Sequence, residues 1–270
     1  MQKWIKGLLV VAAAALAACG GGGGGGSSGG DGSGSAGGNG GSGANPSAQK
    51  ADGLWLGSSS ANRAVNLLVL DNGTYWAIYS AVGKPSVIGG VVQGTYTVNG
   101  SSFVSSDGRD YNLEGDGVLS ISSIVGTYQP RSFFNSQLNY ASAAGSVTLN
   151  ANYSAIYDTP ATLSAVTGRF TGTSVSPAGP ESVSLTVNAS GAISGTSSLG
   201  CSFNGTVSPR NGVGAFDMSI RYNGGECLAG TSTQSGAAYF DPASNRLYVA
   251  GLNASRNSGF VFVGTKASGS

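Results

Sequence analysis

The chain has 270 residues, with 13 Lys and Arg against 12 Asp and Glu, and only 9% of its residues are charged. Its basic residues form no cluster along the chain, which argues against a nucleic-acid partner. It contains no histidine, so the commonest general base, the usual activator of a catalytic serine and the commonest metal ligand are all missing. We therefore expect a protein that is not an enzyme and that uses no cofactor or metal.

Residues 1–18 have the layout of a secretory signal peptide. Lys3 and Lys6 give a positive start, and residues 7–18 form an apolar run without a charge. This run is shorter than the roughly 20 apolar residues that cross a hydrocarbon core. No later stretch reaches that length, so we expect no transmembrane helix in the mature chain. Without Lys3 and Lys6 the 13 basic residues become 11, against 12 acidic ones, for a net charge of −1.

The signal-like segment ends in Leu16-Ala17-Ala18-Cys19, which closely resembles the lipobox of bacterial lipoproteins. The resemblance implies cleavage before Cys19, acylation of its thiol and attachment to a membrane. Two or more acyl chains make such an anchor stable, whereas one gives reversible binding. In enterobacterial lipoproteins an aspartate after the cysteine favours the inner membrane. Here Gly20 follows, so the resemblance implies the outer membrane, with the chain facing the periplasm or the outside. The alternative is an ordinary signal peptide cleaved near Ala18.

Residues 19–50 are rich in Gly and Ser and begin with seven consecutive glycines after Cys19. A glycine run does not hold regular structure, because glycine loses the most backbone entropy when it is ordered. We expect this segment to be a disordered tether, with a root-mean-square span of roughly 30 Å as a random coil. Such a tether would lift the folded residues off the membrane.

Residues 51–157 are predicted to form a first β unit. The runs Val65–Leu70 and Tyr75–Tyr79 flank the turn signal Asp71-Asn72-Gly73, which is typical of a hairpin with a glycine where positive φ is required. A second hairpin is predicted around Asn99-Gly100, the strongest two-residue turn signal.

Aromatic residues gather near the start of this unit: Trp55, Tyr75, Trp76 and Tyr79. Side chains alternate along a strand, so Tyr75 and Tyr79 share one face and Trp76 lies on the other. Packing in a core or barrel is the commoner fate of such side chains, and we expect it here. The alternative is an exposed platform for a sugar or a protein.

The one acidic cluster of the sequence comprises Asp107, Asp110, Glu114 and Asp116. Its carboxylates could hold Ca²⁺, but the cluster lacks the spacing and glycine of an EF-hand loop. Glu114 and Asp116 could also form a glycosidase pair, about 7 Å apart on a strand. The surrounding glycines instead predict an open turn without a pocket. We therefore expect solvated hairpin turns.

The β pattern is interrupted once, at residues 158–167. Asp158-Thr159-Pro160 followed by Ala161–Val166 predicts a short helix with Thr159 as its cap and Pro160 at the first helical position. We expect these residues to connect the first unit to a second β unit at residues 168–266, which precedes a polar tail at residues 267–270.

The second unit shows the same strand and turn signals. Ser182–Val187 alternates polar and apolar residues, the period of a half-buried strand, and Asn188–Gly191 then turns the chain. Asp241–Asn245 separates another pair of predicted strands. Its opening, Gly168-Arg169-Phe170-Thr171-Gly172, echoes Gly53-Leu54-Trp55-Leu56-Gly57 of the first unit. The echo indicates either two related units or the chance similarity of glycine-rich β sequences.

Cys201 and Cys227 are the two cysteines besides Cys19. In an exported chain an even pair favours a disulfide. In the chain-entropy model, a loop of about 26 residues contributes about 3 kcal/mol. The alternative is a pair of buried free thiols.

Short antiparallel strands must protect their edges, and closure into a barrel or sandwich does so. We therefore predict an all-β protein of two small antiparallel β-barrel or β-sandwich units, joined by a short helical connector. This tethered plan resembles surface lipoproteins of Gram-negative bacteria such as factor H-binding protein and transferrin-binding protein B. The resemblance is architectural and assigns no binding residue to this chain.

The sequence supports two hypotheses for function. The first is a non-enzymatic, lipid-anchored outer-membrane lipoprotein whose β units bind a protein partner or serve a structural role in the envelope. The alternative is a lipocalin-like carrier of a small apolar ligand. An interior filled by large side chains would favour the first, and an empty apolar cavity would favour the carrier.

Overall fold

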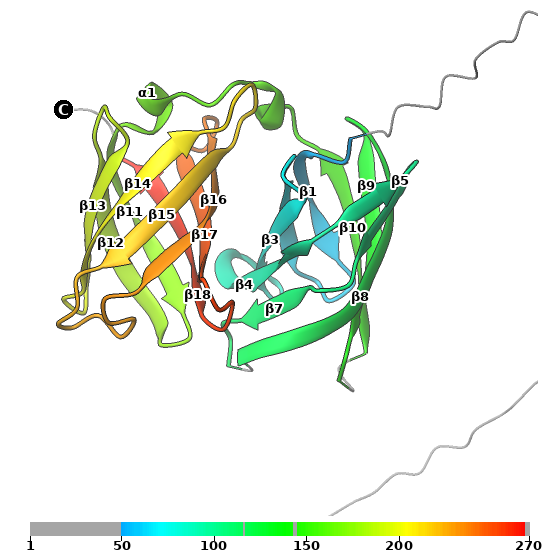
Figure 1. Cartoon of the computed structure of the whole chain (residues 1–270), viewed down its shortest axis with the longest axis horizontal. Coiled ribbons are helices and arrows are strands. Elements are labelled where there is room, and N and C mark those ends of the chain that lie inside the picture. Colours follow the sequence, from blue (N-terminus) through cyan, green and yellow to red (C-terminus); the bar gives the residue numbers. More distant parts are fainter. Residues whose placement is uncertain (1–49, 116, 143–144, 268–270) are drawn as a thin grey trace, which may run out of the picture. The chain divides into compact units, whose positions relative to one another are not determined.

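The computed structural model describes residues 50–115, 117–142 and 145–267. The predicted signal peptide, Cys19 and the predicted tether up to residue 49 lie outside these residues. The described residues belong to one compact unit and form two antiparallel β-barrels joined by two short helical turns (Figure 1). The prediction of an all-β chain is confirmed, and both units close as barrels.

Eight strands of the first barrel run up and down in chain order, and the last of them pairs with the first. An extra hairpin is inserted between β4 and β7 and pairs with β8 through β6. The barrel strands are β1 (Gly53–Ser59), β2 (Ala64–Val69), β3 (Thr74–Ala81), β4 (Lys84–Thr95), β7 (Arg109–Asn112), β8 (Gly117–Gln129), β9 (Phe133–Tyr140) and β10 (Ser146–Tyr153), and the hairpin strands are β5 (Thr97–Asn99) and β6 (Ser102–Ser105).

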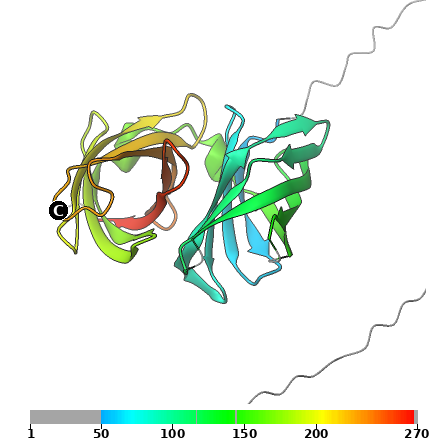
Figure 2. The same cartoon turned by 60° about the horizontal axis from the view of Figure 1, so that its bottom comes forward.

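The second barrel is an uninterrupted meander that closes when β18 pairs with β11. Figure 2 shows it as a ring of strands. Its strands are β11 (Gly168–Ser176), β12 (Gly179–Val187), β13 (Ala192–Ser197), β14 (Ser202–Pro209), β15 (Phe216–Tyr222), β16 (Thr233–Asp241), β17 (Arg246–Asn253) and β18 (Gly259–Lys266).

The predicted hairpins are confirmed, because the strands on either side of each turn pair with one another. The turn residues also adopt the backbone conformation that their sequence favours. Gly73, Gly100 and Gly191 have φ values of +80°, +57° and +83°. These angles lie in the left-handed region, where glycine has no steric penalty. Asn245 ends the turn between β16 and β17 at φ +55°, and asparagine is one of the few other residues that tolerate this region.

The connector differs from its prediction. It contains a 3₁₀ turn at Ala155–Asp158 and one α-helical turn, α1, at Leu163–Val166, so the helix does not begin at Pro160. Thr159 is extended, with φ −88° and ψ 114°, because a following proline disfavours the α region. The Ala161 amide donates instead to the Val213 carbonyl, which keeps this stretch out of a helix.

The two echoed openings occupy equivalent places in the two barrels. Each forms a first strand, and its aromatic residue, Trp55 or Phe170, is fully buried inside its barrel. Gly57 and Gly172 lie against the last strand of their barrels, where a Cβ would meet a backbone oxygen at 2.0 and 2.1 Å. A glycine at this position therefore lets the first and last strands approach closely enough to close the barrel.

Each barrel has its own apolar interior, and a third apolar cluster lies between their outer faces. Tyr75 and Tyr79 point into the first barrel, whereas Trp76 belongs to the cluster between the barrels. The predicted alternation of side chains along this strand is therefore confirmed. The alternative of an exposed aromatic platform is wrong, because Trp76 is buried against residues of the second barrel. We call the third cluster the interbarrel core; it comprises Leu54, Leu68, Leu70, Trp76, Val91, Tyr111, Tyr157, Ala215, Ala237, Tyr239, Ala250, Leu252 and Val261.

We expect the protein to unfold in alkali as its tyrosines ionise. Burial raises the pKa of ten tyrosines above the ordinary value, to about 12 for Tyr96 and Tyr222. The unfolded chain loses these protons near pH 10, so the free energy of unfolding is unaffected by them below that pH and decreases as the pH rises toward 12.

A pH titration that follows phenolate absorbance and near-ultraviolet circular dichroism together checks this expectation. The two signals should change in one cooperative transition. Tyrosines that titrate near their ordinary pKa, while the folded-state dichroism persists, would contradict it.

Candidate ligand cavity

The second barrel encloses a cavity of about 390 Å³, lined by inward-facing residues from all eight of its strands. Most of the wall is apolar, as the alternation of inward and outward side chains along each strand requires. An eight-stranded barrel is just wide enough to be filled by its side chains or to hold one small ligand. The wall residues include Val183, Leu185, Met218, Ile220, Leu247 and Val249.

Two glycines help to keep the centre of this barrel open. Gly195 lies opposite Phe203 on the neighbouring strand, and Gly251 lies opposite Phe260. A Cβ at Gly195 would meet the Phe203 ring at 2.4 Å, and one at Gly251 would meet the Phe260 ring at 2.7 Å. Both rings therefore lie flat against the barrel wall instead of filling its centre. No local sequence pattern indicates this role for Gly195, because the ring that covers it depends on the register of β13 against β14.

The cavity runs from the connector to the loops at the opposite end of the barrel. At the connector end it is lined by Val166 of α1, which is fully buried. At the opposite end it is lined by the β11–β12 loop, by Leu228 and Ala229 of the β15–β16 loop, and by Ser258. Leu228 is 80% exposed, so the cavity reaches the protein surface there. We call this end the mouth.

A disulfide between Cys201 and Cys227 lies at the mouth, with the two Cα atoms 4.4 Å apart. It joins the β13–β14 loop to the β15–β16 loop, and Cys201 itself lines the cavity. The disulfide between these two cysteines is predicted from the sequence, but its position at the cavity is not. In the structure their bond holds two of the loops that surround the mouth.

The polar residues of the cavity wall gather toward the mouth. Gln234 is only 3% exposed, and its Oε1 atom has no hydrogen-bond partner. The buried Oγ of Ser197 is also without one. Burial, together with the charge of Glu181, raises the pKa of Tyr222 to about 12, so this phenol is neutral at physiological pH.

The first barrel has a smaller cavity, of about 250 Å³, which contains a buried carboxylate. Asp110 is 3% exposed and accepts hydrogen bonds from the hydroxyls of Tyr79, at 2.6 Å, and Tyr140, at 2.7 Å. The expectation of a solvated turn is therefore wrong for Asp110. Alternation along β7 turns this side chain inward between Arg109 and Tyr111.

The other acidic residues of the predicted cluster are not brought together. Glu114 pairs with Arg63, and Asp107 pairs with Arg256, while Asp116 lies outside the described residues. No group of three or more His, Cys, Asp or Glu residues within the described ranges is arranged to hold a metal ion.

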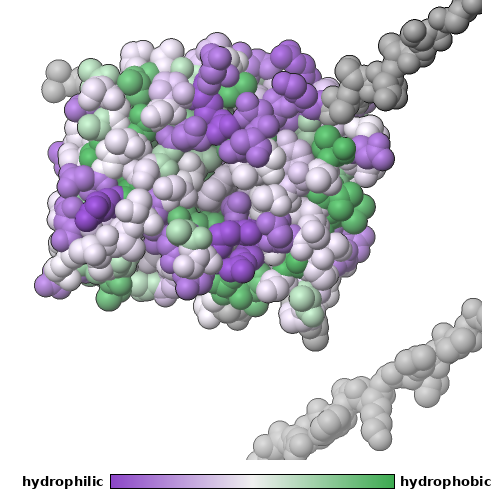
Figure 3. Space-filling model, in the orientation of Figure 1, coloured by the Kyte–Doolittle hydropathy of each residue, from purple (hydrophilic) through white to green (hydrophobic). Residues whose placement is uncertain are grey.

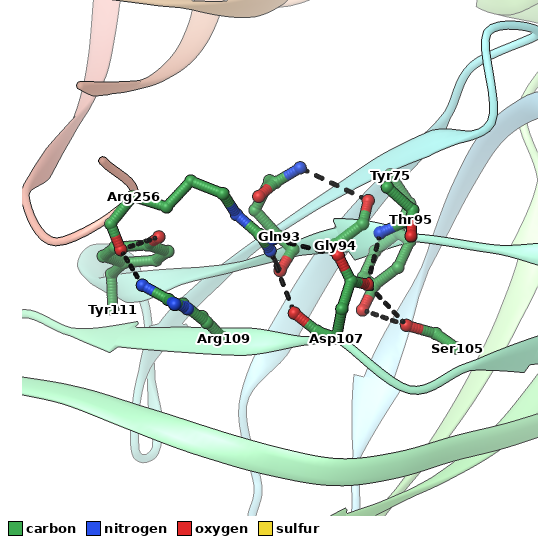
Figure 4. Close-up of polar contacts among 9 residues, drawn as sticks. All are labelled: Tyr75, Gln93, Gly94, Thr95, Ser105, Asp107, Arg109, Tyr111 and Arg256. Atoms are coloured by element: carbon green, nitrogen blue, oxygen red, sulfur yellow. Dashed lines mark hydrogen bonds and ion pairs between the residues drawn. The ribbon is translucent and has the colours of Figure 1, made fainter. Parts of the chain in front are cut away.

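Arg256 links the mouth region of the second barrel to the first barrel (Figure 4). Its guanidinium donates to the Asp107 carboxylate at 2.9 Å and to the carbonyls of Asp107 and Gln93. Its own carbonyl accepts bonds from Arg109, at 2.6 Å, and Tyr111, at 2.8 Å. Although burial raises the pKa of Asp107, its bonds to Thr95 and Arg256 outweigh burial and lower it. This network fixes the β17–β18 turn, which ends at Ser258 of the mouth.

Exposed apolar side chains on the outer surface are mixed with polar ones. On the face in Figure 3, hydrophobic residues are scattered among hydrophilic ones. Leu228 and Leu199 are the most exposed large apolar side chains of the described part of the chain, at 80% and 62%. Both belong to the loops that the disulfide joins. In the residues that the structure describes, no helix is long and apolar enough to cross a membrane.

No protein-family model and no curated protein matches the chain. Solved structures with a similar fold include a candidate outer membrane protein from Bacteroides fragilis, 13% identical, which covers 80% of this chain and 96% of its own at a TM-score of 0.25. A protein of unknown function from Nostoc punctiforme, of the DUF3598 family, is 14% identical with the same coverage and a TM-score of 0.30.

A mutant of the vaccine antigen Transferrin Binding Protein B from Haemophilus parasuis is also similar. It is 12% identical, and the match covers 77% of this chain and 51% of the antigen at a TM-score of 0.27. The names of these neighbours place them as a candidate outer membrane protein, a protein of unknown function and a transferrin-binding antigen, and none is named as an enzyme. At these TM-scores the likeness contributes nothing to a functional assignment, which rests on the cavity.

Proposed function

We propose that this protein is a lipid-anchored outer-membrane carrier whose second barrel holds one small apolar ligand. The observation that carries the proposal is the cavity of about 390 Å³ inside that barrel. Ligand sites in proteins are typically clefts of about 300–1,000 Å³, lined mainly by apolar side chains with a few polar groups. The cavity matches this description in volume and in the composition of its wall.

The cavity favours the carrier over the hypothesis of a protein-docking β unit. The outward-facing apolar residues of the two barrels cover one another in the interbarrel core. Apolar docking surfaces on soluble proteins are usually contiguous patches of several hundred Å². The larger of the two cavities, inside the second barrel, has a mostly apolar wall, where a small molecule fits and a protein does not.

The anchor in this proposal is Cys19, supported by the resemblance of Leu16-Ala17-Ala18-Cys19 to a lipobox. Residues 20–50 would then tether the barrels to the membrane, and Gly20 supports the outer membrane as the location. A carrier on such a tether exchanges its ligand by binding and release alone. It needs no general base, metal or cofactor, which agrees with a chain that has no histidine.

Mass spectrometry of the full chain, purified from the envelope fraction, tests the carrier function. We expect one apolar molecule per chain, retained under native conditions and released by organic solvent. We also expect the emptied protein to bind the neutral dye N-phenyl-1-naphthylamine saturably with one site. A purified chain that carries no small molecule and shows only non-saturable dye partitioning would overturn the proposal.

A further inference from the structure

The cavity in the second barrel has two chemically different ends. Along β12 its wall runs from Glu181 at the mouth to Val187 near the connector. At about 3.3 Å per residue, this separation is roughly 20 Å along the strand. The connector end is apolar, with Val166, Leu247 and Phe262 in the wall. A ligand that fills the cavity therefore places a long apolar chain at the connector end and its polar group at the mouth.

The mouth end contains a hydrogen-bond acceptor that the protein leaves unused. Gln234 lies at the start of β16 with its side chain buried, and no protein group donates to its Oε1 atom. Buried polar atoms in native proteins nearly always have partners, because an unpaired one loses its hydration without compensation. An amide oxygen only accepts hydrogen bonds, so the missing partner is a donor. The hydroxyl of Ser197, which also lines the cavity but belongs to β13, is likewise unpaired and can accept or donate.

The charge at this end is negative. Glu181 is the one charged residue among the described residues that line the cavity. No basic residue belongs to the described cavity wall: the Arg256 guanidinium is bonded to Asp107, and Arg221 on β15 is exposed and does not line the cavity. Glu226, in the β15–β16 loop beside Gly200, adds a second acidic group near the mouth. A carboxylate head group placed there would meet an unpaired acceptor and an acidic side chain, with no cation in the described cavity wall to offset them.

From these contacts we infer that the ligand is a single-chain amphiphile whose head group donates hydrogen bonds and carries no negative charge, such as an alcohol, an amide or an amine. The inference rests on the proposed carrier function and specifies its ligand. The apolar chain lies toward α1, and the head group donates to Gln234 at the mouth. The same arrangement discriminates against the anion of a fatty acid with the same chain.

Competition with N-phenyl-1-naphthylamine tests the choice of head group. The full chain is titrated at neutral pH with dodecanol, dodecylamine and dodecanoate, three compounds that share a chain length and differ in the head group. We expect the alcohol and the amine to displace the dye at concentrations about tenfold lower than the carboxylate, the size of one charge-linked hydrogen bond.

Two variants separate the contribution of the hydrogen bond to Gln234 from that of the negative charge of Glu181. Gln234→Leu should lower the affinity for dodecanol about tenfold while leaving dye binding unchanged, and Glu181→Gln should narrow the difference between dodecanoate and dodecanol. Gln129→Leu, at an exposed position at the end of β8, is the matched control and should change neither. Dodecanoate binding as tightly as dodecanol to the unmodified chain would overturn the inference and leave the carrier function standing. Absence of saturable dye binding would overturn the carrier function and the inference together.

Discussion

The Ala238→Phe variant is expected to fold and to lose its apolar ligand. Ala238 lies on β16, is buried and lines the cavity of the second barrel between Phe216 and Val249 on the adjacent strands. A phenyl ring at this position would occupy part of the cavity volume. We therefore expect the affinity for N-phenyl-1-naphthylamine to fall by at least about tenfold, since a displaced ligand loses most of its buried apolar area.

The stability of this variant should not fall with its affinity. Overpacking a filled core costs about 1–3 kcal/mol, whereas filling a cavity recovers about 24 cal/mol per Å³. We expect a melting temperature equal to or above that of the unmodified chain, measured by circular dichroism without ligand.

Ala77→Phe is the matched control for this experiment. Ala77 lies on β3 and lines the smaller cavity of the first barrel, so the same substitution fills the other barrel. It should leave dye binding unchanged. A folded Ala238→Phe variant that binds the dye like the unmodified chain, or an equal loss in Ala77→Phe, would show that the ligand does not bind in the second barrel.

Cys19→Ser is expected to remove the protein from the outer-membrane fraction. The substitution takes away the thiol that the lipobox resemblance assigns to acylation, and the acyl chains on that thiol are the anchor in the proposed function. We expect an uncleaved or soluble chain that takes up no labelled fatty acid. Fractionation of the envelope after a high-salt wash, together with fatty-acid labelling of the cell, measures both effects.

The double variant Cys201→Ser, Cys227→Ser controls for loss of cysteine as such. It removes the disulfide at the mouth, which should lower the free energy of unfolding by about 3 kcal/mol in the chain-entropy model. This double variant should still take up labelled fatty acid and should remain in the outer-membrane fraction. If Cys19→Ser stays with that fraction after washing, the lipid is not the anchor.

The sequence by itself determined the features that depend on neighbouring residues. The hairpins at Gly100 and Gly191 follow from turn residues that accept a positive φ. The opposite faces of Tyr75 and Trp76 follow from the alternation of side chains along a strand. The choice of Cys201 and Cys227 as disulfide partners follows from the expectation of an exported chain, in which they are the two cysteines that remain once Cys19 is assigned to the predicted lipobox.

Other features required contacts between residues that are distant in the chain. Asp110 is buried because the hydroxyls of Tyr79 and Tyr140, which belong to other strands, reach it inside the first barrel. Its own neighbours in the sequence indicated a solvated turn. Likewise Arg256 meets Asp107 across 149 positions of sequence, a pairing for which no local pattern exists.

Only the tertiary structure decided between barrel and sandwich, and between a filled interior and a cavity. Closure of the second barrel depends on the pairing of β11 with β18, which are the first and last strands of this barrel in the sequence. The open centre depends on a register that sets Phe203 over Gly195 and Phe260 over Gly251. Alternation gives the face on which a side chain lies, but a shift of register changes what it lies against. The volume left inside the barrel is therefore a property of all eight strands together.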